Sequence, residues 1–190
     1  MELLKETILK KGKVLSGDVL KVGSFLNNQI DVKLLSAMAD DVFAHFKDKK
    51  VTKVLTVEAS GIAFACFIAE RFSCDAVFAK KSMTTNVDGE TFCADCYSFT
   101  HKTANKLIVP KEYLSEKDVV LVADDFLANG QAVNALISII KDAGAELCGV
   151  AIAIEKGFQC GGDALRNRGV DIYSLAVIDE MNAGGIKFRA

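Results

Sequence analysis

The stretch of sequence that decides the fold is Val119 to Ala132, VVLVADDFLANGQA. Its first five residues, 119–123, form a continuous apolar run, which is typical of a central parallel strand covered on both faces. Asp124 and Asp125 end this run. Ligands of parallel sheets bind at the carboxyl ends of the strands, so the sequence predicts both carboxylates at the ligand edge, where they can accept hydrogen bonds from sugar hydroxyls.

The residues after the two aspartates predict a phosphate-binding turn. Residues 126–132, FLANGQA, supply a short polar residue, a glycine and small residues that lead into a helix expected over about 131–143 and closed by Gly144. Backbone N–H groups of such a turn and the helix N-terminus can hold a phosphate. An ordinary strand-to-helix turn with a solvated acidic pair has the same pattern. The turn is neither a P-loop nor a dinucleotide fingerprint, because it lacks the glycine spacing of both motifs.

The flanking sequence predicts an α/β domain with a mostly parallel central sheet flanked by helices. The first clear helix is expected from Asp31 to Lys47, with Asp31 as N-cap. Its apolar stripe consists of Leu35, Met38, Val42 and Phe46. Further strands are expected over 53–57, 76–79, 147–154 and 171–177, and further helices over 62–72 and 163–168. The polar segment 82–95 is expected to form a mobile flap or a hairpin.

Size and composition bound the function. A chain of 190 residues that is 51% hydrophobic suits one globular domain. The net charge of −2, with both signs mixed throughout, argues against a general nucleic-acid partner. No signal core or membrane-spanning run is visible, so a cytoplasmic protein without a membrane partner is expected. The six cysteines are expected to be free thiols, several of them in the core.

Two acidic residues, two apolar residues and then small-x-Gly-x-small resemble the binding motif for phosphoribosyl diphosphate (PRPP) of type I phosphoribosyltransferases. Within that family the resemblance is to bacterial members that act on xanthine. It covers nearly the whole chain and includes VLSGDVLKVGSFLNNQID at 14–31, YSFT at 97–100 and IEKGFQ at 154–159. The resemblance implies one phosphoribosyltransferase domain over residues 1–190, with a core from about 32–154 and a small hood from about 1–31 and 155–190.

The resemblance also assigns roles on the PRPP side of the site. Asp124 and Asp125 would face the ribose 2′- and 3′-hydroxyls as the catalytic pair. The residues that would cradle the 5′-phosphate are Ala128, Asn129, Gly130, Gln131 and Ala132. The loop that resembles the family's diphosphate loop is Glu58, Ala59, Ser60 and Gly61. Lys80 and Lys81 would add positive charge, although a solvated basic pair has the same sequence. Mg²⁺ is expected through PRPP itself, with no protein metal site.

For the purine base, the resemblance points to Leu20, Asn27 and Lys156. Xanthine presents carbonyl acceptors at C2 and C6, which suit a lysine donor and an asparagine amide. Leu20 would give an apolar contact, and Phe158 could stack on the ring. The implied reaction joins xanthine to PRPP, with xanthosine 5′-monophosphate and diphosphate as products. A homodimer is also implied.

The loop departs from the family at two places. Many relatives that use oxopurines have an aspartate at the position of Ala128, where it can contact the base N7. Xanthine is itself fairly acidic and can need less help, or a flap carboxylate (Asp88, Glu90 or Asp95) can serve instead. The family's usual threonines beside the phosphate are replaced by Asn129 and Ala132.

The sequence leaves two alternative functions open, an adenine or other purine phosphoribosyltransferase and a non-catalytic sensor. An adenine phosphoribosyltransferase also has alanine at the position of Ala128, but the Asn27 and Lys156 segments favour an oxopurine. A non-catalytic sensor of PRPP or purines with the same fold would need a DNA-binding or RNA-binding element, for which the first 30 residues leave little room. Cys93 and Cys96 have the spacing of half a zinc site, yet on a strand they would face opposite sides. Neither His45 nor His101 forms a catalytic constellation.

Overall fold

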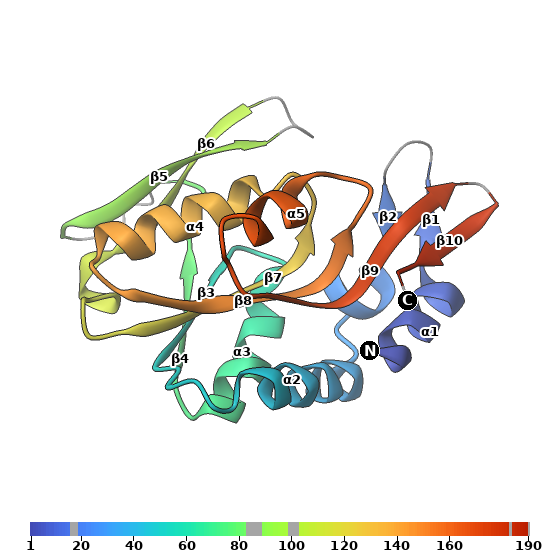
Figure 1. Ribbon diagram of the computed structural model, residues 1–190, viewed down its shortest axis with the longest axis horizontal. Coiled ribbons are helices and arrows are strands. Elements are labelled where there is room, and N and C mark those ends of the chain that lie inside the picture. The colour runs from blue at the N-terminus through green and yellow to red at the C-terminus, as the bar shows by residue number, and fades with distance from the viewer. Residues whose placement is uncertain (16–18, 83–88, 99–102, 183, 190) are drawn as a thin grey trace.

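The computed structural model describes residues 1–15, 19–82, 89–98, 103–182 and 184–189. Figure 1 shows the order of the elements along the chain. The helical elements are α1 (Glu2–Lys11), the π-helix η1 (Gly23–Asn27), α2 (Val32–Phe46), α3 (Gly61–Phe72), the short 3₁₀ helix η2 (Lys111–Tyr113), α4 (Gln131–Asp142) and α5 (Gly161–Arg166). The strands are β1 (Lys13–Val14), β2 (Leu20–Lys21), β3 (Lys53–Val57), β4 (Asp75–Ala79), β5 (Thr91–Ser98), β6 (Thr103–Pro110), β7 (Val119–Leu127), β8 (Glu146–Lys156), β9 (Ile172–Asn182) and β10 (Gly185–Phe188).

A six-stranded sheet in the order β10-β9-β8-β7-β3-β4 forms the centre of the molecule. The neighbours from β9 to β4 pair in parallel, and β10 pairs with β9 in the antiparallel direction. The predicted α/β fold with a mostly parallel sheet is therefore confirmed. β7 lies in the interior of this sheet, with β8 on one side and β3 on the other. This position explains its apolar sequence, since both of its faces are covered.

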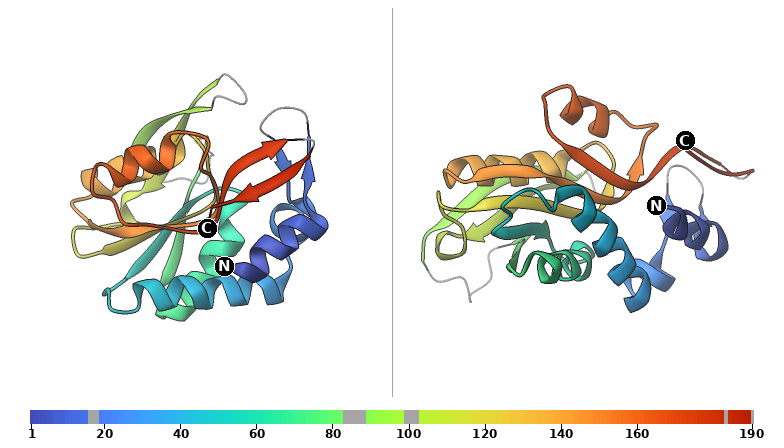
Figure 2. Two further views of the ribbon diagram at one scale, coloured as in Figure 1. Left: turned by 45° about the vertical axis from the view of Figure 1, so that its right-hand side comes forward. Right: turned by 60° about the horizontal axis from the view of Figure 1, so that its bottom comes forward.

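Helices cover both faces of the sheet (Figures 1 and 2). On one face, α2 and α3 pack through a core that includes Met38, Phe46 and Phe64. On the other face, α4 packs through Leu136 and Ile139, and α5 adds Leu165. The antiparallel hairpin of β5 and β6 lies over α4 on its outer side (Figure 1). The carboxyl ends of β3, β7 and β8 are left to the loops that the sequence predicted to hold the ligand.

The predicted helix after Asp31 forms as α2, with Asp31 as its N-cap residue and Lys47 as its C-cap residue. The Asp31 side chain accepts a hydrogen bond from the Leu34 N–H, 3.2 Å away, and so satisfies a helix N–H group that has no partner within the helix. The four residues predicted for the apolar stripe are all buried. At the other end of the prediction, Lys47 follows the last helical residue, Phe46.

The two ends of the chain lie together beside the sheet. The N-terminal amine donates to the Leu175 carbonyl oxygen in β9, and the small β1–β2 sheet lies next to β9 and β10 in both Figures 1 and 2. Leu20, Val22 and Phe25 join the same hydrophobic cluster as Ile154 of β8. Among the described residues, no helix is long and apolar enough to cross a membrane.

The polar segment 82–95 was expected to be a flap or a hairpin. Its second half forms the start of β5, which pairs with β6 over its whole length. Residues 83–88 lie outside the described residues. The cysteines form no disulfide, and their positions differ: Cys148 is buried, Cys74 and Cys96 are partly buried against the core, and Cys66, Cys93 and Cys160 are exposed.

Candidate active site

The two predicted catalytic aspartates lie near the carboxyl end of β7. Each is only 7% exposed, although adjacent residues of a strand point to opposite faces, because both faces of the sheet are covered here. The Asp125 N–H donates to Asp124 Oδ1 at 3.0 Å. Burial raises the pKa of the Asp124 carboxyl well above its usual value of 3.8, and the neighbouring carboxylate of Asp125 raises this pKa further. The site therefore holds an acidic pair that is little exposed to solvent.

The loop after this pair turns directly into α4. Gly130 has a φ of 75°, a left-handed conformation that favours glycine, and is the N-cap residue of α4. Its carbonyl oxygen accepts from the backbone N–H of Asn134 at 2.9 Å and from its side-chain Nδ2 at 2.8 Å. The predicted phosphate loop thus lies at the N-terminus of a 12-residue helix, where free N–H groups and the helix dipole favour an anion.

The predicted diphosphate loop, 58–61, lies against the acidic pair. A Cβ atom added at Gly61 would overlap the Thr56 hydroxyl and lie 3.1 Å from Asp124 Oδ1. Only glycine therefore lets the start of α3 come this close to β7. Within the described part of the chain, the buried Thr56 hydroxyl has no hydrogen-bond partner. The peptide bond between Glu58 and Ala59 is cis.

The basic pair that follows β4 joins the same place. The Lys81 N–H donates to Glu58 Oε1 at 2.7 Å, and the Glu58 N–H donates to the Ala79 carbonyl oxygen at 3.1 Å. The Lys81 charge acts on the pKa of Asp124 in the opposite direction to burial. The backbone of Lys80 pairs with Ile108 of β6. The structure therefore brings the loop 58–61, Lys81 and the acidic pair together.

The residues predicted for the base come from two parts of the chain. Leu20 is buried in the hood, and Asn27 is exposed at the end of η1. Lys156 ends β8, and its Nζ lies 5.9 Å from the centre of the Phe126 ring. Phe158 follows two residues later and is 38% exposed. The structure thus provides an apolar ring beside the lysine, while a contact between the hood residues and Lys156 remains a prediction.

Several residues around the site were not selected from the sequence. Phe126 is one of the two apolar residues that follow the acidic pair in the motif. Because neighbouring residues of a strand point to opposite faces, its position next to Leu127 was the signal that could have placed its side chain. Thr56 and Gly161 have no local signal, because their roles depend on residues distant in sequence. Gly161 lies against the predicted phosphate loop: an added Cβ would overlap the Ala128 carbonyl oxygen and lie 2.6 Å from Gly130 N.

The three flap carboxylates differ in their surroundings. Glu90 pairs with Lys111 at 2.8 Å, and this cation lowers the pKa of the Glu90 carboxyl. Asp95 is exposed on β5, and Asp88 lies outside the described residues, as does His101. His45 is at the surface, where it stacks on Tyr173 with 4.2 Å between ring centres.

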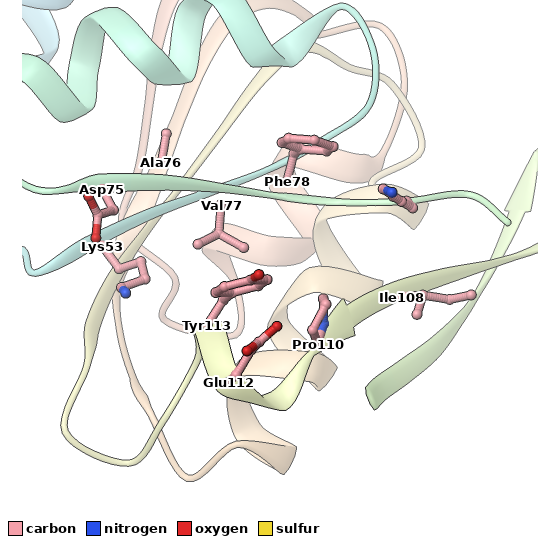
Figure 3. A pocket seen from close by; sticks show the side chains of 10 residues that line it. Lys53, Asp75, Ala76, Val77, Phe78, Ile108, Pro110, Glu112 and Tyr113 are labelled. Atoms are coloured by element: carbon pink, nitrogen blue, oxygen red, sulfur yellow. The ribbon is translucent and has the colours of Figure 1, made fainter. Parts of the chain in front are cut away.

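A separate cavity of about 540 Å³ lies along β4 (Figure 3). Figure 3 shows Tyr113 and Glu112 of η2 opposite Val77 of β4. Of the residues assigned to the site, Lys80 alone lines this cavity. Because its far end is formed by the first residues of β3 and β4, it extends away from the carboxyl ends of the strands.

Comparison with known proteins places this arrangement in a family. The phosphoribosyl transferase domain matches residues 21–160. A xanthine phosphoribosyltransferase of Bifidobacterium animalis is 50% identical over 192 residues and one of Clostridium novyi 48% over 189, each alignment covering 100% of both chains. Among solved structures, the adenine phosphoribosyltransferase of Giardia lamblia in complex with 9-deazaadenine has a TM-score of 0.77 at 21% identity, covering 91% of this chain and 96% of that one. At that identity the structural likeness concerns the fold alone, whereas the domain match and the full-length relatives decide the family. This chain belongs to the phosphoribosyl transferase family.

Proposed function

We propose that this chain transfers the 5-phosphoribosyl group of PRPP to xanthine, giving xanthosine 5′-monophosphate and diphosphate, in purine salvage. One observation carries the proposal: a buried acidic pair, the loop at the N-terminus of α4 and the cation Lys81 lie together at one edge of the sheet. The choice of xanthine as the substrate is supported by relatives named xanthine phosphoribosyltransferase, one of which, from Ruminiclostridium cellulolyticum, is 46% identical over 99% of this chain.

On the PRPP side, the proposal gives each segment one part of the substrate. Residues 128–132 cradle the 5′-phosphate with backbone N–H groups and the N-terminus of α4. Asp124 and Asp125 accept hydrogen bonds from the ribose hydroxyls. The loop 58–61 and the two lysines, Lys80 and Lys81, bind the diphosphate. This division is supported by the contact of Gly61 with Asp124 and of Lys81 with Glu58.

On the base side, Lys156 and Asn27 donate to the carbonyl oxygens of xanthine, while Leu20 and Phe158 contact its ring. The position of the Lys156 ammonium over Phe126 supports this part of the proposal, because it places a cation beside an aromatic ring at the carboxyl end of β8.

The reaction breaks the bond between the ribose C1 and the diphosphate oxygen, forms one from C1 to a nitrogen of the base, and releases the proton of that nitrogen, which a diphosphate oxygen can accept. Positive charge develops at the ribose, so the buried carboxylates near its hydroxyls act where charge appears. The lysines and backbone N–H groups stabilise the departing diphosphate, and the two half-sites hold C1 and the base nitrogen in line.

Mg²⁺ fits this donor set, as we propose, when PRPP supplies most of its ligands. Carboxylate oxygens such as those of Asp124 and Asp125 are hard donors that Mg²⁺ accepts. Within the described ranges, no three His, Cys, Asp or Glu side chains gather into a protein cage. When bound, the ion neutralises diphosphate charge, and its proximity would favour the charged form of the buried pair.

The test is steady-state turnover of PRPP with xanthine, guanine, hypoxanthine and adenine at equal concentrations. We expect the highest kcat/KM with xanthine. A preference for adenine would overturn the substrate assignment, and absence of turnover with every base would overturn the enzymatic proposal. Crystals soaked with xanthine check the base site separately, since xanthine bound without contact to Asn27 or Lys156 contradicts it.

We also propose a homodimer that works in the cytoplasm. Two exposed aromatic side chains, Phe78 (40% exposed) and Tyr113 (50% exposed), lie on the cavity beside the edge strand β4. The same surface has both Lys53 and Asp75, so two copies related by a two-fold axis could pair opposite charges. Covering this surface would remove exposed apolar area from water.

A further inference from the structure

The short helix α5 lies against the phosphate loop, with the backbone of Gly161 and the side chain of Leu165 at the contact. A Cβ atom at Gly161 would overlap the Ala128 carbonyl oxygen, and Leu165 Cδ1 would be 3.4 Å from a Cβ at Gly130. The loop therefore has the backbone of α5 as its support. Any movement of α5 toward or away from β7 would move the atoms proposed to hold the 5′-phosphate.

A second contact joins the region of α5 to the same loop. Arg168 Nη1 donates to Asn134 Oδ1 at 2.6 Å, and Asn134 Nδ2 donates to the Gly130 carbonyl oxygen at 2.8 Å. The arginine lies just after α5 and the asparagine lies in the first turn of α4. This pair therefore fixes the orientation of the peptide at Gly130 from the outside of the loop.

A buried ion pair holds α5 to the sheet. Glu155 is 1% exposed, and its two carboxylate oxygens accept from Arg166 Nη1 at 2.7 Å and Nη2 at 2.6 Å. Oε2 also accepts from the Ser174 hydroxyl of β9. Burial alone would raise the pKa of Glu155, but the hydrogen bonds from Arg166 and Ser174 together outweigh it and leave this pKa below its usual value. The carboxylate is therefore charged.

The position of Glu155 connects both halves of the proposed site. In the sheet it pairs with Leu127, the residue before the phosphate loop, and in sequence it precedes Lys156. Gly162 leaves room for it, since a Cβ there would overlap Glu155 Oε1 and lie 2.7 Å from Arg166 Nη1. A buried ion pair is weak evidence for stability, because desolvation offsets the attraction. Stability alone therefore does not account for this arrangement.

We propose that Glu155 and Arg166 are positioning residues: their ion pair holds α5 against the phosphate loop and fixes that loop relative to Lys156. The inference rests on the proposed function, because the ligand of the loop is taken to be the 5′-phosphate of PRPP. Neither residue touches the substrate. Their effect is on where the loop N–H groups lie.

The experiment measures KM for PRPP, KM for xanthine, kcat and the melting temperature of Glu155→Gln, Arg166→Met and the double variant Glu155→Leu/Arg166→Met. We expect KM for PRPP to rise about 10-fold or more in each, with a smaller change in kcat, because ground-state binding by the loop is what weakens. The double variant removes both charges and so leaves no unpaired ion in the interior, which separates positioning from stability.

Arg71→Met is the matched control. Arg71 is also a partly exposed arginine (23%, against 32% for Arg166) that binds a carboxylate, Asp40, and a serine hydroxyl, Ser36, but it joins α2 and α3 away from the site. Its partner carboxylate is exposed (65%, against 2% for Glu155), so the double variant, which leaves no buried charge, is the one to compare with it. A structural role alone predicts that Arg166→Met and Arg71→Met both lower the melting temperature and both leave KM for PRPP within about 2-fold. That result would overturn the inference.

Two further variants keep the test open if a buried substitution prevents folding. Asn134→Ala and Arg168→Ala leave the ion pair intact and should raise KM for PRPP with little change in melting temperature. Unchanged PRPP kinetics in both would count against support of the loop by this region. Calorimetric titration of the unmodified chain with PRPP separates failure of the proposed function from failure of the positioning role. Absence of binding overturns the proposed function. Binding by the unmodified chain, together with an unchanged KM for PRPP in the variants, overturns the positioning role alone.

Discussion

At the scale of single residues, Asp124 shows the cost of the site to the fold. Its carboxyl group is buried beside a second carboxylate, and both conditions disfavour its charged form. The backbone hydrogen bond from the Asp125 N–H and, after it, the charge of Lys81 act in the opposite direction and lower this pKa. The fold therefore holds at this position a carboxyl group whose charged form is disfavoured, and we propose that substrate binding offsets this cost.

Replacement of Asp124 by asparagine should stabilise the protein and impair its activity. Folding raises the pKa of Asp124, so the folded protein binds this proton more tightly than the unfolded chain. The unfolding free energy therefore falls as the pH rises from about 4, the pKa in the unfolded chain, toward the higher pKa in the folded protein. We expect Asp124→Asn to melt at least about 2–4 °C higher near pH 7, corresponding to about 1 kcal/mol, and to have the same stability as the unmodified chain below pH 4 or so. Its kcat/KM should fall about 10-fold or more, since a charged hydrogen bond is lost.

Asp118→Asn is the contrasting control. Burial favours the protonated form of Asp118, but its hydrogen bonds with Ser115 and Thr52 outweigh this and lower its pKa. This variant should therefore be destabilised near neutral pH, and its kinetics should not change. Thermal melts of both variants across the pH range check the signs. Equal shifts of the two would contradict the account of Asp124.

Lys156→Met should discriminate the base site from the PRPP site. Removal of the ammonium over Phe126 deletes a donor proposed for xanthine and leaves the phosphate loop in place. We expect KM for xanthine to rise about 10-fold or more, as for a hydrogen bond to a charged group, and KM for PRPP to change less than about 2-fold. Lys187→Met is the control, because Lys187 pairs with Glu180 at the surface of the β9–β10 hairpin. A rise in KM for PRPP alone would contradict the assignment.

The residues of the candidate site differ in how far the sequence determined them. The acidic pair and Gly130 stand in one continuous motif, so local spacing located them at the end of a strand, while their roles came from the family resemblance. Leu20 and Asn27 came only from the family resemblance, and no local rule selects them. Glu155 and Gly161 were missed, because a buried glutamate becomes recognisable only when Arg166 and Ser174, distant along the chain, are placed around it.

At the scale of elements, α2 packs on the sheet through Phe46, whose ring lies against a glycine of β8. A Cβ atom at Gly149 would lie 2.5 Å from Phe46 Cε1 and 3.0 Å from the Asp171 carbonyl oxygen. The glycine therefore sets how closely this helix approaches the strand. The contact is far from the carboxyl ends of the strands, so it should affect stability and not substrate binding.

Gly149→Ala should lower the unfolding free energy by about 1–3 kcal/mol, the usual cost of overpacking a core. Urea unfolding gives this value directly. Combination with Phe46→Leu should cost less than the sum of the two single substitutions, because the smaller side chain yields space to the new methyl group. Strict additivity would contradict the proposed contact. The KM values of the Gly149→Ala variant should equal those of the unmodified chain.

The elements that the sequence predicted are those with strong local patterns. The strand over 53–57 has its predicted bounds, and the predicted helices agree to within two residues, whereas β7 continues four residues past the predicted 123. α1 was missed because it buries only Leu4 and Ile8 among many charged residues. β9 extends to Asn182, beyond the predicted 177, because its last residues pair with β10, and that pairing depends on tertiary structure.

At the scale of the whole molecule, the described residues of the N-terminal segment 1–31 pack beside the sheet and its helices, while the C-terminal residues pair within the sheet itself as β9 and β10. The hydrophobic cluster on the α2 and α3 side runs from the helices into this N-terminal segment, from Phe64 to Leu20 and Phe25. Since the proposed base residues come from the hood and from the end of β8, the relative position of these two parts sets the width of the base site. This dependence on both ends of the chain explains why no single segment predicted the site.

The proposed dimer gives the last prediction. A specific interface buries about 1,200–2,000 Å² in total and has apolar side chains at its centre. The surface along β4 offers Phe78 and Tyr113 for that role. Phe78→Lys would place a charge there in each copy, and like charges facing across a two-fold axis disfavour association. Sedimentation velocity should give twice the mass of one chain for the unmodified protein and one chain mass for Phe78→Lys.

Leu9→Lys, at an exposed position of α1 (59% exposed), should remain dimeric. A monomeric unmodified protein would contradict the dimer itself. A dimeric Phe78→Lys would place the interface on another face, and the mass of the control decides whether added charge alone accounts for dissociation.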